Sequence, residues 1–182
     1  MDNYTTVGKS LSDAGMHMIF TGHFHANDIA LKDFGTSTLH DCETGSLVTS
    51  PTPYRFVNLN MPARSFQIAT SHVLSIPSHA TDFVSFENSF LMNGLVGISV
   101  YQLTHAPYNL DVATASAIAP MVAVSMMAHY AGDESLTDPT LTTTLYGMAG
   151  SADPATHMLG LSLLSLWNDP APHDNNVTLT VN

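Results

Sequence analysis

Basic side chains are scarce in this sequence and are confined to its first 64 residues. The chain has 182 residues, of which 10% are charged, and its formal net charge is −11. Lysine and arginine occur only at Lys9, Lys32, Arg55 and Arg64. Nucleic acids and anionic membrane surfaces are bound through basic residues that neutralise phosphates. The sequence therefore predicts no nucleic-acid partner for residues 65–182, which include the helical part.

Cysteine and membrane-type segments are also sparse. Cys42 is the only cysteine, which excludes an internal disulfide. Residues 1–4 show neither the basic nor the apolar stretch that opens a signal peptide. The longest apolar run, residues 113–128, contains Pro120 and is shorter than the ~20 residues of a membrane span. We expect a soluble protein with no transmembrane segment, and the sequence assigns no compartment.

Hydrophobic spacing predicts a mixed α/β fold whose first part spans residues 1–76. A helical pattern at 3–14 is followed by an apolar strand at 16–21. Asp28 has two equally weighted interpretations, as the N-cap of one or two helical turns within 26–34 and as a partner of a metal ligand. Further short strands are predicted at 36–43, 54–59 and 64–71.

The second part, residues 77–182, is predicted to be mainly helical. Helices are expected at 79–103 and at 109–130, the latter capped by Asn109 and bent at Pro120. An aspartate followed by proline is a typical helix start, and it predicts two more helices, at Asp138-Pro139 and at Asp153-Pro154. Residues 177–181 alternate in polarity and are expected to return as a strand to the sheet begun near residue 16.

The most distinctive motif is Gly22-His23-Phe24-His25, which directly follows the first predicted strand. We expect the side chains of His23 and His25 to point to opposite sides of the loop, whereas one shared ion would need both rings to converge. Two neighbouring ions, each bound by one imidazole, fit that spacing better. A histidine pair beside a turn is by itself more often a surface or core feature, so the surrounding residues must decide.

Those surroundings resemble the last metal-binding motif of the calcineurin-like metallophosphoesterases. The resemblance covers roughly residues 4–60, and it continues through residues 41–47 and 51–55. Residues 129–134 and 167–170 resemble, more weakly, the helical tail of one bacterial branch of that family. The resemblance implies that residues 1–76 form the C-terminal part of a metallophosphoesterase domain, followed by a helical subdomain with a closing strand.

By this resemblance, His25 binds the first and His23 the second ion of a dinuclear centre that hydrolyses phosphate esters. The divalent metal, whether Mn, Fe, Zn or Ni, is not distinguished by imidazole ligands. Four residues are implied as neighbours of these ligands or of the substrate: Phe24, Asn27, Asp28 and Arg55. For Arg55, an exposed position without a function is the more common alternative.

The earlier motifs of the family are absent before Gly22, including its Gly-Asn-His and its catalytic residues. We therefore expect a C-terminal portion that is inactive alone. The strand that ends at Gly22 should then lack a neighbour, so that the chain self-associates or needs its missing N-terminal half.

Three alternatives stay open at this stage. One is a non-catalytic helical interaction module with a vestigial histidine pair, and another is a mononuclear metal-binding protein. A second cation site within the helical part is a third alternative, although hydrogen bonding at a helix end explains its histidine more simply. Its candidate residues are His129, Asp133, Glu134, His173 and Asp174.

Overall fold

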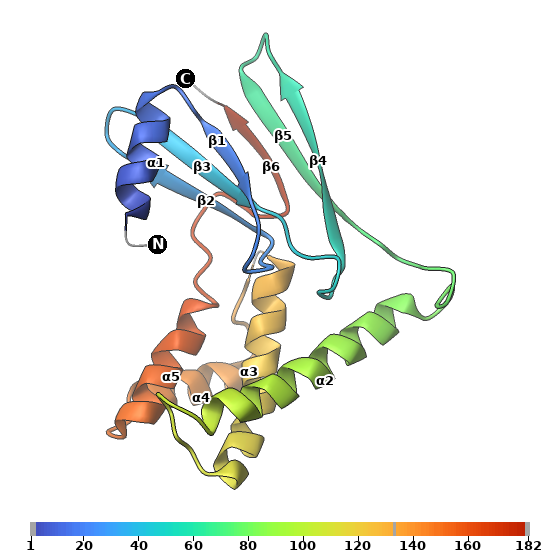
Figure 1. Cartoon of the computed structure of the whole chain (residues 1–182), viewed down its shortest axis with the longest axis vertical. Helices are drawn as coiled ribbons and strands as arrows, with labels where there is room; N and C mark the ends of the chain where they lie inside the picture. The colour runs from blue at the N-terminus through green and yellow to red at the C-terminus, as the bar shows by residue number, and fades with distance from the viewer. Residues whose placement is uncertain (1–2, 133, 181–182) are drawn as a thin grey trace.

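The computed structural model describes residues 3–132 and 134–180, and it divides into a sheet region and a helical region (Figure 1). The sheet region contains helix α1 (Tyr4–Asp13) and two sheets of three strands each. The helical region contains α2 to α5 and lies below the sheets in Figure 1. The predicted mixed α/β class is therefore confirmed. The division of the sequence at residue 77 into two domains stays a prediction.

The first sheet is built from the strands on either side of the histidine motif. β1 (Met18–Thr21) pairs in parallel with β3 (Thr38–Glu43), and β2 (Asp28–Asp33) pairs with β3 on its other side in the antiparallel direction. The strand order is thus β1-β3-β2, which leaves β1 at an edge within the described part of the chain. Helix α1 lies against this sheet.

The second sheet is antiparallel and has the order β4-β5-β6. β4 (Pro53–Asn60) and β5 (Ser65–His72) form a hairpin, and β6 (Asn176–Thr180) pairs with the other edge of β5. The two sheets contact each other through a small apolar cluster, in which Ile29 and Cys42 of the first sheet meet Ile68 and Leu179 of the second.

Four helices form the helical region: α2 (Phe83–Leu103), α3 (Val112–Ala131), α4 (Pro139–Ala149) and α5 (Pro154–Ser165). They share a core built on Leu103, Ala115, Leu145, Leu159 and Leu163. The two Asp-Pro starts are confirmed, because the Asp138 carboxylate accepts from the Thr140 and Leu141 amides and the Asp153 carboxylate accepts from the Thr156 amide.

Three local predictions were wrong. Residues 28–33 form strand β2 instead of helical turns, so Asp28 is not a helix N-cap. Residues 28–33 join the sheet because each of them pairs with a residue of β3. Such strand pairing overrides a weak local preference for helix. The N-cap of α3 is Asp111, not Asn109. The closing strand β6 joins β5 instead of the sheet that contains β1.

Helix α3 is longer than the apolar run that the sequence suggested. Its 20 residues, Val112–Ala131, are long and apolar enough to cross a membrane by length and composition. A core helix of a globular protein meets the same two criteria. Ala115, Ala119 and Ala123 of α3 are fully buried, and α3 packs along α2. Only 28% of its apolar stretch is buried, so these contacts cover one face of α3.

Candidate functional site

The histidine motif forms an exposed loop between β1 and β2. His23 and His25 both adopt positive φ values, 104° and 64°. Non-glycine residues rarely adopt this conformation, because the Cβ atom then crowds the backbone. The loop is therefore not extended. An extended backbone would in any case place side chains at i and i+2 on the same side, so the expectation that the two rings point to opposite sides has no basis.

The two rings have different aromatic neighbours. His23 meets Phe24 edge-on, with ring centroids 5.6 Å apart, and Phe24 itself is 75% exposed. His25 faces Tyr130, near the end of α3, with ring centroids 6.4 Å apart. The structure thus brings the histidine loop to the C-terminal end of α3, more than 100 residues further along the chain.

Asn27 anchors the end of this loop. It is completely buried, and its amide donates to Asn175 Oδ1 at 2.6 Å and to Thr70 Oγ1 at 3.3 Å. The backbone N–H of Gly45 donates to the Asn27 side-chain oxygen at 3.5 Å. One side chain therefore connects the histidine loop with β5, with the loop after β3 and with the segment before β6.

Carboxyl groups gather next to this anchor, where the sheet region meets the helical region. Asp174 is only 2% exposed and accepts a hydrogen bond from the Ile29 backbone N–H at 2.8 Å. Burial, together with the charge of the neighbouring Asp174, raises the pKa of Asp28 to about 6. The partner of the Asp28 carboxyl is thus another carboxyl, with which it shares a hydrogen bond.

His129 and Glu134 complete this group of ionisable residues. Their side chains are 2.7 Å apart, from His129 Nδ1 to Glu134 Oε1. That hydrogen bond raises the pKa of His129, so its ring is charged over a wider pH range. The positive ring partly balances the negative charge of Asp28 and Glu134.

Three carboxylates lie close enough together to share an ion at the junction, which is the place where the sheet region meets the helical region around Asn27 and Asp174. One oxygen each of Glu134, Asp169 and Asp174 lies within 4.8 Å of the others. Oxygen ligands suit hard cations such as Mg²⁺ or Ca²⁺. Acidic groups also cluster without an ion, so this geometry alone assigns no metal. Of the residues weighed for a second cation site, Glu134 and Asp174 meet here, whereas Asp133 lies outside the described residues.

Arg55 points into the junction from β4. Its guanidinium donates to Cys42 Sγ at 2.8 Å, to the Asp174 carbonyl at 2.8 Å and to the Asp28 carbonyl at 3.4 Å. These contacts join both sheets with the segment before β6. They favour a role in positioning this segment over contact with a substrate phosphate.

Sequence reasoning missed Asn175 and Gly45 as parts of this site. Asn175 touches Asn27 across 148 positions, and no local pattern reveals such a pair. Gly45 is required because a Cβ there would come within 2.6 Å of Pro53 and 3.3 Å of the His25 carbonyl. The only sequence signal for this role of Gly45 is its position shortly after Glu43, the acidic residue that ends a predicted strand.

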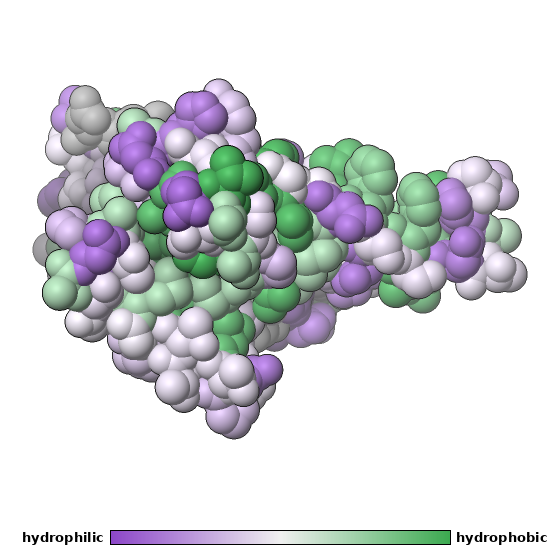
Figure 2. Space-filling view, turned by 90° about the horizontal axis from the view of Figure 1, so that it is seen from below, coloured by the Kyte–Doolittle hydropathy of each residue, from purple (hydrophilic) through white to green (hydrophobic). Residues whose placement is uncertain are grey.

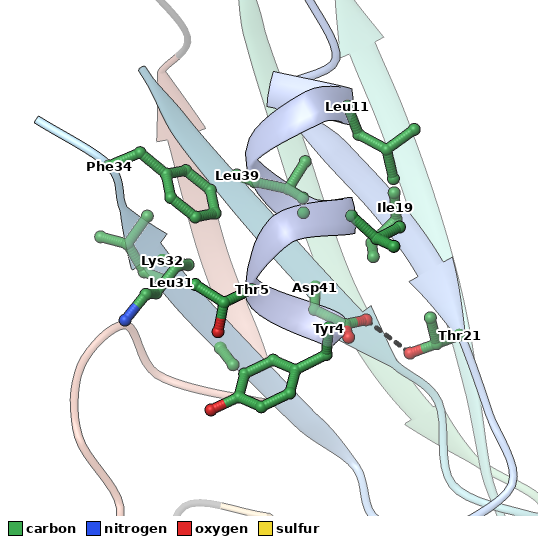
Figure 3. A pocket seen from close by; sticks show the side chains of 13 residues that line it. Tyr4, Thr5, Leu11, Ile19, Thr21, Leu31, Lys32, Phe34, Leu39 and Asp41 are labelled. Carbon is green, nitrogen blue, oxygen red and sulfur yellow. Dashed lines mark hydrogen bonds between the residues drawn. The ribbon is translucent and has the colours of Figure 1, made fainter. Parts of the chain in front are cut away.

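A separate apolar hollow of about 480 Å³ lies between α1 and the first sheet (Figure 3). Tyr4, Leu11, Ile19, Leu31 and Phe34 contribute to its lining. A hydrogen bond from Thr21 to Asp41 lies at one side of it. Neither His23 nor His25 lines this hollow, so it is distinct from the histidine loop.

No family model matches this chain, and no curated protein matches it.

Proposed function

We propose that this chain is the C-terminal part of a metal-dependent phosphoesterase, to which it contributes His23 and His25 as metal ligands. The observation that carries the proposal is the positive φ of both histidines. Backbone strain of this kind is concentrated at functional sites, where surrounding contacts impose it. The resemblance of the Gly-His-x-His motif to calcineurin-like metallophosphoesterases supplies the reaction class.

The chemistry needs more ligands than this motif offers. When bound, two neighbouring divalent ions polarise a phosphate ester and supply hydroxide at neutral pH. His25 would hold one ion and His23 the other, each through a neutral imidazole. Two imidazoles do not complete the coordination of two ions. We infer that the remaining ligands come from another polypeptide segment and that the isolated chain has little activity.

Metal binding at the loop is tested by titrating the histidine-labelled chain with Zn²⁺ and following the imidazole signals by NMR. The expected result is weak binding that shifts the signals of His23 and His25 and is lost in His23→Ala and His25→Ala. His157→Ala is the matched control, because His157 is an exposed histidine at the start of α5. Zn²⁺ binding that survives both loop substitutions would contradict the proposal.

Catalysis is tested with a generic aryl phosphodiester in the presence of Mn²⁺. We expect turnover far below the roughly 1–10³ s⁻¹ that is typical of complete enzymes. Full turnover by the isolated chain would show that other residues of this chain supply the missing ligands. That result would refute the inference that the site is incomplete, but it would not contradict the assignment of His23 and His25 as metal ligands.

The edge strand β1 bears on how the rest of the site is supplied. Its outer edge is unpaired within the described residues, and Phe20 on this strand is exposed. Such an edge accepts another strand. We therefore expect the chain to self-associate or to combine with a polypeptide that carries the other ligands. Sedimentation velocity at several concentrations tests this, and a strictly monomeric chain would rule out self-association.

A non-catalytic helical interaction module is the second candidate function. Figure 2 views the molecule from the helical end, where hydrophobic residues gather across the middle of the face. Several large hydrophobic side chains of the helices are exposed, among them Phe90, Ile98, Tyr101, Tyr146 and Leu161. Failure of Zn²⁺ to perturb either loop histidine would favour this module over the phosphoesterase.

A further inference from the structure

The contacts of Asn27 extend beyond the loop that it ends. Its partner Asn175 donates from Nδ2 to the backbone carbonyl of Ala131 at 3.1 Å. A continuous chain of side-chain hydrogen bonds thus runs from the histidine loop through Asn27 and Asn175 to the last residue of α3. The Asn27 side chain thus connects the histidine loop with the helical region.

Close packing reinforces the same connection. Gly132, which follows α3, has a φ of 75°, and a Cβ at this position would lie 2.3 Å from the Asn27 carbonyl oxygen. The same Cβ would lie 3.0 Å from Asp174 Cβ and 3.3 Å from Asn175 Nδ2. The backbone at the end of α3 therefore lies directly against the backbone of Asn27, and only glycine fits at position 132.

The loop has an exposed part and a buried end. His23, Phe24 and His25 are exposed, whereas Ala26 and Asn27 are buried. A non-glycine residue with positive φ keeps that conformation only where its surroundings impose it. Asn27 stands two positions after His25 and has the most extensive side-chain contacts of the loop.

We propose that Asn27 is a positioning residue, which holds His25 and His23 in the conformation that binds metal and makes that conformation depend on the end of α3. The proposal rests on the assignment of His23 and His25 as metal ligands. Asn27 contacts no metal in this scheme. It acts through the backbone of residues 23–27 and, on its other side, through Asn175.

The alternative is that Asn27 only satisfies buried polar groups and thereby stabilises the fold. A purely structural residue would change stability without changing the Zn²⁺ affinity of the folded chain. Ser125 offers a matched control, because it is fully buried in α3 and its hydroxyl accepts from Trp167 Nε1 at 3.0 Å. Ser125→Ala removes a buried hydrogen bond of the helical region without touching the histidine loop.

The experiment measures Zn²⁺ affinity by NMR of the His23 and His25 ring signals, at a temperature where thermal unfolding shows each variant to be folded. The full chain is compared with Asn27→Ala, Asn175→Ala, the double variant and Ser125→Ala. We expect Asn27→Ala to weaken Zn²⁺ binding by about 10- to 100-fold, as is usual when the support of a metal ligand is removed. Asn175→Ala should weaken it in the same direction, and Ser125→Ala should leave it unchanged.

The double variant tests whether the two asparagines act together. If they form one unit, its loss of affinity will be smaller than the product of the two single losses. Equal Zn²⁺ affinity in folded Asn27→Ala and in the unaltered chain would overturn the proposal, and so would multiplicative losses. If Asn27→Ala does not fold, Asn175→Ala decides, because it removes the same hydrogen bond from the other side. Absence of Zn²⁺ binding by the unaltered chain would instead refute the proposed function.

Discussion

The sheet region and the helical region bury apolar side chains to different extents. The helical core is built on five buried residues from all four helices, with many partly buried neighbours such as Ile118, Val122 and Trp167. The sheet core has four buried residues, and only Met18 and Val177 pack against it from partly buried positions. The helical region therefore has the larger apolar core, whereas the sheet region carries the histidine loop.

Charge is distributed just as unevenly. Helices α2 to α5 contain one charged residue, Glu87, if histidine is counted as neutral. Glu87 is buried and accepts a hydrogen bond from Thr52 of the sheet region. All four basic residues belong to the sheet region. The two apolar cores are thus joined by a polar junction around Asn27, Asp28 and Asp174, and the candidate site lies at this junction.

The largest expected effect comes from the helical core. Leu145 of α4 is 0% exposed, so Leu145→Ala should lower the free energy of unfolding by about 2–5 kcal/mol. Trp167 fluorescence reports on the helical region, and reaction of Cys42 with a thiol reagent reports on the sheet core. Because the buried junction joins both regions, we expect Leu145→Ala to lower the urea midpoint of unfolding by the same amount whether it is followed by Trp167 fluorescence or by Cys42 reactivity. A shift of the Trp167 transition alone would mean that the two regions unfold independently.

Arg55→Leu should come next and should weaken the link between the regions. The substitution removes hydrogen bonds to Cys42, Asp28 and Asp174, and because Arg55 is partly exposed, water replaces part of these contacts and keeps the loss below that of Leu145→Ala. We expect lower stability and a separation of the Trp167 and Cys42 transitions. Lys32→Gln is the control, since Lys32 is an exposed basic residue of β2. Coincident transitions in Arg55→Leu would show that other contacts suffice to join the regions.

A smaller effect is expected from the ionisation of Asp28. Its pKa rises from 3.8 to about 6 on folding, so the folded chain binds the proton more tightly than the unfolded chain does. The stabilisation is complete below pH 3.8 and is lost as the pH rises through about 6. Asp28→Asn should therefore raise the melting temperature at pH 8 and have little effect near pH 4. Partial exposure to water limits the size of this change.

The raised pKa of His129 acts in the same direction, because its stabilising charge is present at low pH and is lost as the pH rises. Asp33→Asn is the control for the substitution at Asp28, since Asp33 is exposed at the other end of β2. A melting temperature of Asp28→Asn that stays below that of the unaltered chain at pH 8 would show that the charged form of Asp28 is the stabilising one.

The smallest effect concerns the start of α4. Asp138 accepts from the backbone N–H of Thr140 at 2.7 Å and of Leu141 at 3.0 Å. Asp138→Ala should cost about 1 kcal/mol, as is usual for the loss of a helix N-cap. Asp82 occupies the same position at α2 but makes no capping hydrogen bond, so Asp82→Ala should cost less. An equal loss in both variants would contradict capping as the cause.

Local patterns were sufficient for most elements of the fold. The positions of α1, β1, β3 and of the helices after Asp138 and Asp153 were predicted within a few residues. Each of these depends on interactions within one turn or on the alternation of a single strand. The segment 28–33 was mispredicted because its conformation depends on pairing with β3, which a single-segment pattern does not contain.

The sequence by itself determined that a glycine and two histidines follow an apolar strand, and that aspartates start the last two helices. Only the tertiary structure decided what surrounds them. Asn27 meets Asn175, Asp28 acquires a raised pKa beside Asp174, and Arg55 turns inward. The reason is physical, since helix caps and turns need neighbours within a few residues, whereas burial and long-range hydrogen bonds exist only once distant segments have packed together.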